Sequence, residues 1–136
     1  MSGQTIVSRK ALQFTNDNKK AYAFSGEVDA DVNNTLLLEF NTESYYLDSK
    51  IYIYNSSGSA DDFRYSVLFN NIVIVSPYAN SSNVSPSYFN PIETIIPPHT
   101  NVQIRADNVS SVSLRNHTAH VIANVGMAPR VGNLDE

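Results

Sequence analysis

The sequence contains no cysteine and no tryptophan among its 136 residues. Without cysteine, the chain has no disulfide framework, no thiol nucleophile and no thiolate ligand for a metal ion. A single domain of this length buries roughly two-thirds of its unfolded surface, so its core needs neither a disulfide nor a metal to stabilise it. Glycine is scarce as well, with five residues, so asparagine and proline are expected to form most of the turns.

The chain also lacks any excess of positive charge and any long apolar run. Its formal net charge is −4, whereas general nucleic-acid binding depends on lysine and arginine neutralising phosphates. No run approaches the roughly 20 apolar residues of a membrane span, and no apolar stretch of signal-peptide length follows Met1. We therefore expect a soluble protein without an export signal, whose partners include neither nucleic acid nor a membrane.

Catalytic motifs are missing too. The sequence has no nucleophile elbow, no glycine loop for phosphate and no dinucleotide fingerprint. His117 and His120 are the only close pair of histidines, at a point where a loop is expected to enter a strand. Residues three apart in a strand point to opposite faces, and no third metal ligand is near. The sequence therefore predicts no enzyme, no metal site and no cofactor.

Short β-prone runs are present, separated by clusters of asparagine, serine and proline. The clearest case is Phe63–Phe69, followed by Asn70, Asn71 and the run Ile72–Val75. Asparagine tolerates the left-handed conformation that a two-residue hairpin turn needs. These residues predict a β-hairpin. One face of its first strand is expected to carry Phe63, Tyr65, Val67 and Phe69.

Other runs with period-two alternation predict further strands. These runs cover residues 20–28, 36–40, 45–54, 92–96, 102–106, 109–114 and 119–125. Leu36, Leu38 and Phe40 are expected to share one face of their strand, with Leu37 on the other. Residues 76–91 form the longest irregular stretch, and connections of this length in compact domains are often functional.

The number and spacing of these runs predict the fold class. About eight strands follow one another at spacings of roughly 8–15 residues, and no segment has a helical period. A parallel sheet would require crossover helices between its strands. We therefore predict an all-β protein: an antiparallel β-sandwich with a jelly roll as the expected topology and with extended terminal arms.

Three regions are expected along the chain. Residues 1–19 form an N-terminal arm that could include a first strand at 7–14, residues 20–127 form the sandwich domain, and residues 128–136 form a C-terminal tail. The first 20 residues carry four basic side chains against one acidic one, whereas the rest carries five basic and twelve acidic side chains. A basic arm can dock on an acidic neighbour, although it can also serve only to keep the terminus soluble. The candidate docking residues are Arg9, Lys10, Lys19, Lys20 and Arg130.

Tyrosine is more abundant than the core requires, with eight residues. Exposed tyrosines can stack on sugar rings, and they are also enriched in protein interfaces. The absence of tryptophan weakens the interpretation as a sugar-binding platform. If sugars are bound, the candidate stacking residues are Tyr45, Tyr46, Tyr78 and Tyr88.

Three stretches of the chain carry a resemblance to a known family. They are residues 35–40, the hairpin at 65–75 with its Asn-Asn turn, and residues 95–104 followed by Asn108 and the run 121–127. In this order they resemble small β-sandwich structural proteins of tailed bacteriophages, of the kind that decorate or cement a capsid. The resemblance covers about residues 20–127. It implies a jelly-roll-like fold, a place in the virion and no catalytic residues.

These observations predict a non-enzymatic virion structural protein. The expected role is that of a capsid decoration or cement protein, bound to the major capsid protein and assembled in the host cytoplasm. Self-association into a homo-oligomer is expected, with a trimer as one form, because closed symmetry is usual for such proteins. Two alternatives remain open: a carbohydrate-binding or receptor-binding module such as a fibre head, and a tail, portal or neck component of the virion.

Overall fold

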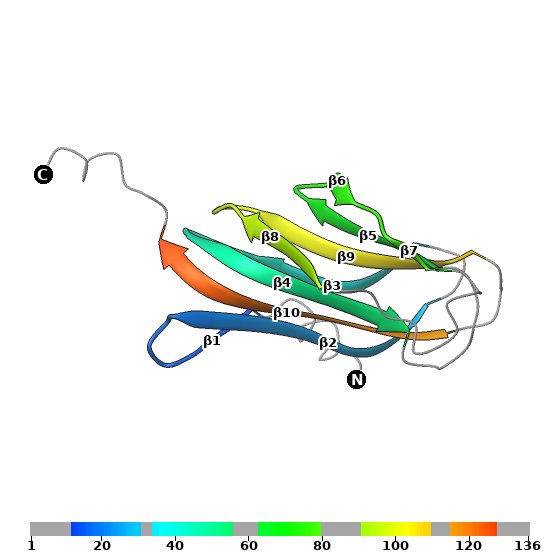
Figure 1. Ribbon diagram of the computed structural model, residues 1–136, viewed down its shortest axis with the longest axis horizontal. Helices are drawn as coiled ribbons and strands as arrows, with labels where there is room; N and C mark the ends of the chain where they lie inside the picture. Colours follow the sequence, from blue (N-terminus) through cyan, green and yellow to red (C-terminus); the bar gives the residue numbers. More distant parts are fainter. Residues whose placement is uncertain (1–11, 31–33, 56–62, 80–90, 110–114, 128–136) are drawn as a thin grey trace, which may run out of the picture.

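The computed structural model describes residues 12–30, 34–55, 63–79, 91–109 and 115–127. Within these ranges all regular structure is β, in two antiparallel sheets packed face to face (Figure 1). The strands are β1 (Gln13–Phe14), β2 (Lys20–Ala30), β3 (Thr35–Asn41), β4 (Tyr45–Asn55), β5 (Phe63–Phe69), β6 (Ile72–Val75), β7 (Tyr78–Ala79), β8 (Ile92–Ile96), β9 (Asn101–Asn108) and β10 (Arg115–Met127). The predicted all-β antiparallel sandwich is confirmed.

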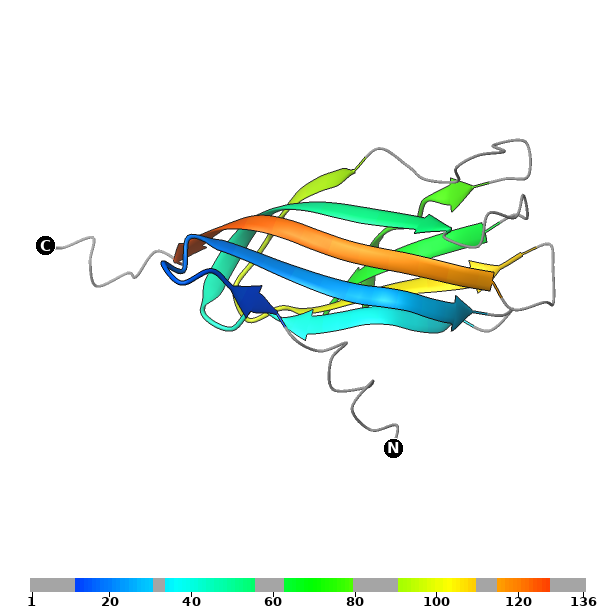
Figure 2. The same ribbon diagram turned by 90° about the horizontal axis from the view of Figure 1, so that it is seen from below.

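The order of strands in the two sheets follows a nested pattern. Sheet A has the order β1-β2-β10-β4-β8, and sheet B has the order β3-β9-β5-β6, with β7 also paired to β5. Among the eight longer strands, β2 pairs with β10, β3 with β9, β4 with β8, and β5 with β6. The first half of the chain therefore pairs with the second half in reverse order, and the paired strands enclose a common core. Figure 2 shows sheet A from its outer side, with β10 in orange between β2 and β4.

The core lies between the sheets and follows the period-two pattern of the strands. In β5 the side chains of Phe63, Tyr65, Val67 and Phe69 share the inner face, as predicted; the first three are fully buried and Phe69 is half-buried. β2 and β10 contribute mostly alanine and valine to the interior, so the volume of the core comes from the other strands. Its largest apolar members are Tyr65, Phe40, Phe63, Leu37, Leu38, Leu47, Ile51, Ile96 and Ile104.

A β-bulge in β2 changes which of its side chains face the core. Gly26 adopts a left-handed φ of 68° at the point where two residues of β2 oppose one residue of β10. The extra residue shifts the alternation by one, so Ala21 and Ala23 are buried before the bulge and Val28 after it. Gly26 suits this position because it has no Cβ to strain a positive φ.

A second bulge lies in β3. Leu37 is the extra residue between the pair Leu36–Arg105 and the pair Leu38–Ile104. Leu37 and Leu38 are both fully buried as a result, and Leu36 is half-buried. The prediction that Leu36 and Leu38 share one face, with Leu37 on the other, is therefore wrong.

Two segments predicted to be irregular contain strand residues. The predicted strand begins at Ala119, but residues 115–118 already pair with β2, and His117 and Thr118 also pair with β4. β10 therefore begins at Arg115. β7 lies within the stretch 76–91, where the backbone N–H of Tyr65 donates to the carbonyl oxygen of Pro77 and β7 pairs with β5 beyond β6. The predicted strands at 7–14 and 109–114 fall mostly outside the described residues.

The turn of the β5–β6 hairpin has the predicted left-handed conformation. Asn70 and Asn71 have φ values of 50° and 68°. The side-chain oxygen of Asn70 also accepts a hydrogen bond of 2.8 Å from the backbone N–H of Asn101. This bond ties the hairpin turn to the start of β9.

Replacing Asn71 by valine is expected to lower the free energy of unfolding by about 1–2 kcal/mol, because a β-branched side chain is strained at positive φ. Glycine at the same position is expected to cost nothing or to stabilise the hairpin slightly, since it has no Cβ. Urea denaturation of both variants measures the difference. Equal destabilisation by the two substitutions would contradict the left-handed conformation of this turn.

Candidate functional site

The outer side of sheet A carries large apolar side chains. The buried residues at the start of β2 are alanines, so Tyr22 and Phe24 at the alternate positions point outward. The register places Tyr22 opposite Ile122 and Phe24 opposite His120 of β10, and it places His120 opposite Tyr52 of β4. We call this surface the outer aromatic face. It is defined by Tyr22, Phe24, Tyr52, Tyr54, His120 and Ile122.

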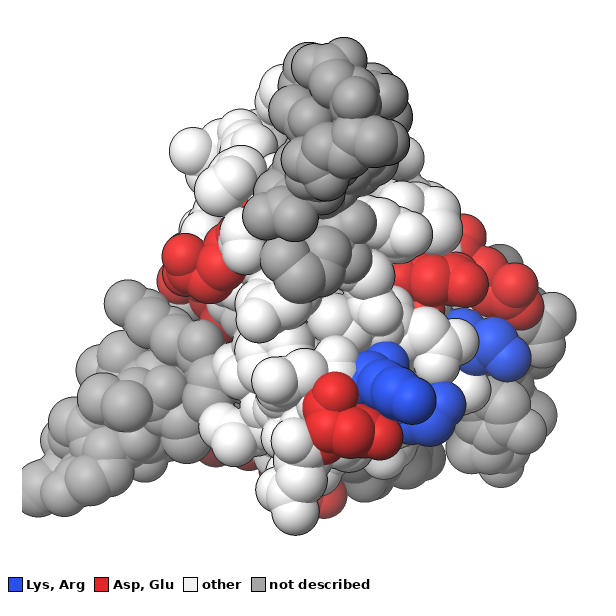
Figure 3. All heavy atoms as spheres, turned by 90° about the vertical axis from the view of Figure 1, so that its left-hand side faces the viewer, with Lys and Arg blue, Asp and Glu red and all other residues white. Residues whose placement is uncertain are grey.

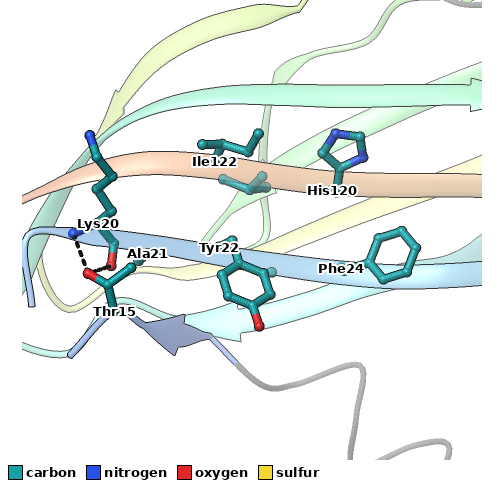
Figure 4. A pocket seen from close by; sticks show the side chains of 9 residues that line it. Thr15, Lys20, Ala21, Tyr22, Phe24, His120 and Ile122 are labelled. Atoms are coloured by element: carbon teal, nitrogen blue, oxygen red, sulfur yellow. Dashed lines mark hydrogen bonds between the residues drawn. The ribbon is translucent and has the colours of Figure 1, made fainter.

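The outer aromatic face is exposed and hollowed. Phe24 is 56% exposed, and Tyr22 and Ile122 are each 50% exposed. Together with His120, they line an open hollow of about 510 Å³. Figure 4 shows Tyr22 and Phe24 along β2, and Ile122 and His120 along the neighbouring β10. Large apolar side chains gathered in one patch are typical of an interaction surface.

His120 lies at the centre of this aromatic cluster. Its ring stacks on Tyr52, with 4.7 Å between ring centroids and 15° between planes. The rings of Phe24 and Tyr54 meet it edge-on at 6.2 Å and 6.4 Å. Partial burial lowers the pKa of His120 below its ordinary value of 6.5. The imidazole is therefore mostly neutral at pH 7 and contributes aromatic surface without a charge.

A charged border lies beside the outer aromatic face, toward β8. Lys20, Asp48, Lys50 and Glu93 line a second hollow of about 310 Å³, which shares Lys20 and Ile122 with the first. Two positive and two negative side chains make this border neutral overall. An apolar centre with a polar rim is the usual anatomy of a protein interface.

Two of the predicted basic docking residues, Lys19 and Lys20, lie in the described part of the chain. Lys19 and Lys20 are exposed at the turn between β1 and β2. In this turn Asp17 accepts hydrogen bonds from the Thr15 hydroxyl at 2.8 Å and from the backbone N–H of Lys19 at 3.1 Å, which lower the pKa of its carboxyl. Figure 3 shows basic side chains beside acidic ones at one end of the sandwich. The predicted residues outside the described ranges are Arg9, Lys10 and Arg130.

Three of the tyrosines predicted to stack on sugars lie in the described part of the chain, and these three do not converge. Tyr45 and Tyr46 are half-buried at the start of β4, whereas Tyr78 is exposed on β7 at the opposite end of the sandwich (Figure 1). Tyr78 instead contacts Arg64, whose guanidinium carbon lies 4.8 Å from the ring centroid. Tyr88 lies outside the described residues. The three described tyrosines therefore do not form one platform.

The sequence contains a signal for the outer aromatic face that residue-type arguments overlooked. Tyr22 and Phe24 alternate with Ala21 and Ala23, so both faces of this strand are apolar. A strand of this kind is either covered on both sides or leaves one apolar side exposed. The alternation alone does not say which side is exposed.

The two close histidines lie on opposite faces of β10, as predicted. His120 belongs to the outer aromatic face, whereas His117 is fully buried, and its Nδ1 is hydrogen-bonded to the Tyr65 hydroxyl at 2.9 Å. Burial lowers the pKa of His117 to about 4 and raises the pKa of Tyr65. Both groups are therefore uncharged at neutral pH, and the pair belongs to the core.

In the part of the chain that the structure describes, no cluster of three or more His, Cys, Asp or Glu residues is placed to hold a metal ion, and no helix could span a membrane. No protein-family model matches the sequence, and a search of curated proteins finds no similar one. The candidate site therefore rests on the geometry of the outer aromatic face itself.

Proposed function

We propose that this chain is a non-enzymatic structural protein of a virion, a capsid decoration or cement protein that binds the major capsid protein and self-associates. The outer aromatic face is the observation that carries the proposal. Aromatic side chains are enriched at the centres of protein interfaces, where water is excluded. The charged border beside the face supplies a polar rim. Assembly takes place in the host cytoplasm, and the protein resides in the virion.

The strand order supports the same proposal. Among the eight longer strands the first pairs with the last, the second with the seventh, the third with the sixth and the fourth with the fifth. A jelly roll has this pairing order, and we infer that the sandwich belongs to this class. Jelly rolls form viral capsid domains and lectin domains, among others. A fold alone does not define a function. The outer aromatic face therefore remains the main argument.

Replacing Phe24 by lysine is expected to weaken capsid binding at least about tenfold, because a charge would be desolvated near the centre of the interface. The measurement is co-sedimentation of the purified protein with capsids built from the major capsid protein of the same genome. Asn41→Lys is the matched control, since it adds the same charge at an exposed position of sheet B. Failure of the unmodified protein to bind such capsids would refute the proposal.

A carbohydrate-binding module or receptor-binding fibre head is the second candidate, and one observation favours it. The apolar hollow adjoins the charged hollow through Lys20 and Ile122. A sugar ring has an apolar face that stacks on aromatic rings, and it has hydroxyl groups that hydrogen-bond carboxylates and lysines. Saturable glycan binding by the unmodified protein, without affinity for capsids, would favour this candidate over the first.

A further inference from the structure

β6 presents three consecutive exposed apolar residues at the edge of sheet B. Ile72, Val73 and Ile74 are 68%, 54% and 42% exposed. Among the described strands β6 pairs only with β5, so its other side carries backbone N–H and C=O groups that no strand of the sheet satisfies. Figure 1 shows β6 at the top of the view, at the margin of the molecule. Such an edge is a template for another strand.

The other edges of the two sheets, as far as the structure describes them, carry features that discourage pairing. β1 and β7 have only two residues each, and the part of β2 that β1 does not cover contains a bulge, Glu27 and Asp29. β3 contains Glu39 and a bulge, and β8 contains Glu93 and lies between Pro91 and Pro97. Charges, prolines, bulges and short length are the usual protections of edge strands. β6 has no charged residue and no proline, so only its short length and one bulge limit its pairing.

We propose that β6 pairs with β6 of a second copy of this chain, antiparallel and about a two-fold axis, so that the two sheets B join into one. The proposal rests on the self-association that forms part of the proposed function. A two-fold arrangement satisfies both edges at once, because the same surface serves both copies. The pairing makes the basic unit a dimer rather than the trimer considered from the sequence.

The lack of charge and the residue types of the hairpin favour a second copy of the chain as the partner of β6. Residues 70–77 carry no charged side chain, so two copies of an acidic protein meet there without like charges facing each other. Isoleucine and valine are β-branched, and β-branched residues form favourable cross-strand pairs. Four residues give few backbone hydrogen bonds, so the dimer is expected to be weak and dependent on concentration.

Light scattering across a hundredfold range of concentration tests the pairing. The mass of the unmodified protein is expected to rise from that of one chain toward that of two. Val73→Lys is expected to remain at the mass of one chain, because the introduced lysines repel each other across the axis. Ile95→Lys is the matched control. Ile95 is also 54% exposed on an edge strand, but in sheet A, so this variant should still dimerise.

Hydrogen exchange separates backbone pairing from a simple apolar contact. The β6 amides that face away from β5 are expected to become protected at high concentration in the unmodified protein, but not in Val73→Lys. A monomer at every concentration, or a dimer that Val73→Lys leaves intact, would overturn the proposal. Capsid co-sedimentation distinguishes the two hypotheses. A monomer that binds capsids refutes the β6 pairing and self-association in solution but leaves the capsid role, whereas a dimer without capsid affinity refutes only the capsid role.

Discussion

Replacing Phe63 by alanine is expected to lower the free energy of unfolding by about 3–5 kcal/mol, the range for removing a buried aromatic ring. The Phe63 ring is fully buried, with its centroid 4.6 Å from that of His117 and 6.4 Å from that of Tyr65. His117 belongs to sheet A and Tyr65 to sheet B, so the ring fills space between the two sheets. Domains have about 5–15 kcal/mol of stability in total, so this loss is a large fraction of the stability that a domain has.

Phe24→Ala is the matched control, since it removes the same atoms from the outer aromatic face. Phe24 is more than half exposed, so its loss is expected to cost less than about 1 kcal/mol. Urea denaturation of the two variants gives both values. Similar costs would mean that Phe63 does not lie in the core, or that the outer aromatic face is covered in the isolated protein.

The β5–β6 hairpin could be predicted from the sequence because its determinants are local. Asn70 and Asn71 supply the left-handed turn without help from the rest of the chain. Phe63, Tyr65 and Val67 face inward because β5 pairs with β9 without a register shift, so the period of two is preserved. Where alternation is uninterrupted and only one face of the strand is apolar, as in β5, the sequence is enough to assign the buried face.

The faces of β2 and β3 depend on bulges, which interrupt the alternation. A glycine inside a strand, such as Gly26, is a sign of a bulge, but nothing at Leu37 marks it as an extra residue. The inward position of Ala21 and Ala23 also depends on the space that the large side chains of sheet B leave between the sheets. That space is a property of the packed core, so it cannot be predicted from the sequence of β2 alone.

The outer aromatic face could not be predicted from the sequence, because it depends on the register between strands that are distant in the chain. Phe24, His120 and Tyr52 meet only through the pairing of β2, β10 and β4, which are far apart in the chain. The prediction of the basic residues and the tyrosines as contact residues depends on residue type alone. Residue type indicates that such side chains favour the surface, but it does not determine which of them meet there.

Stability is expected to fall as the pH is lowered from about 6.5 to about 4, chiefly because of His117. Burial holds the pKa of this imidazole at about 4 in the folded state, against about 6.5 in the unfolded chain. Above pH 6.5 both states are neutral, and the full stability is present. Between these values the unfolded state binds a proton that the folded state does not, so the free energy of unfolding decreases by about 3 kcal/mol in total.

His117→Gln is expected to remove most of this pH dependence, measured as the slope of unfolding free energy against pH. The substitution also disturbs the hydrogen bond with Tyr65, so the slopes are compared rather than the absolute stabilities. His120, whose pKa burial also lowers, adds a contribution of the same sign, and the lowered pKa of Asp17 makes its carboxyl act mainly near and below its ordinary pKa of 3.8. His99→Asn is the matched control at an exposed turn with φ of 57°, which asparagine tolerates. An unchanged slope in His117→Gln would mean that the imidazole has the same pKa in the folded and the unfolded chain, which would contradict its burial between the two sheets.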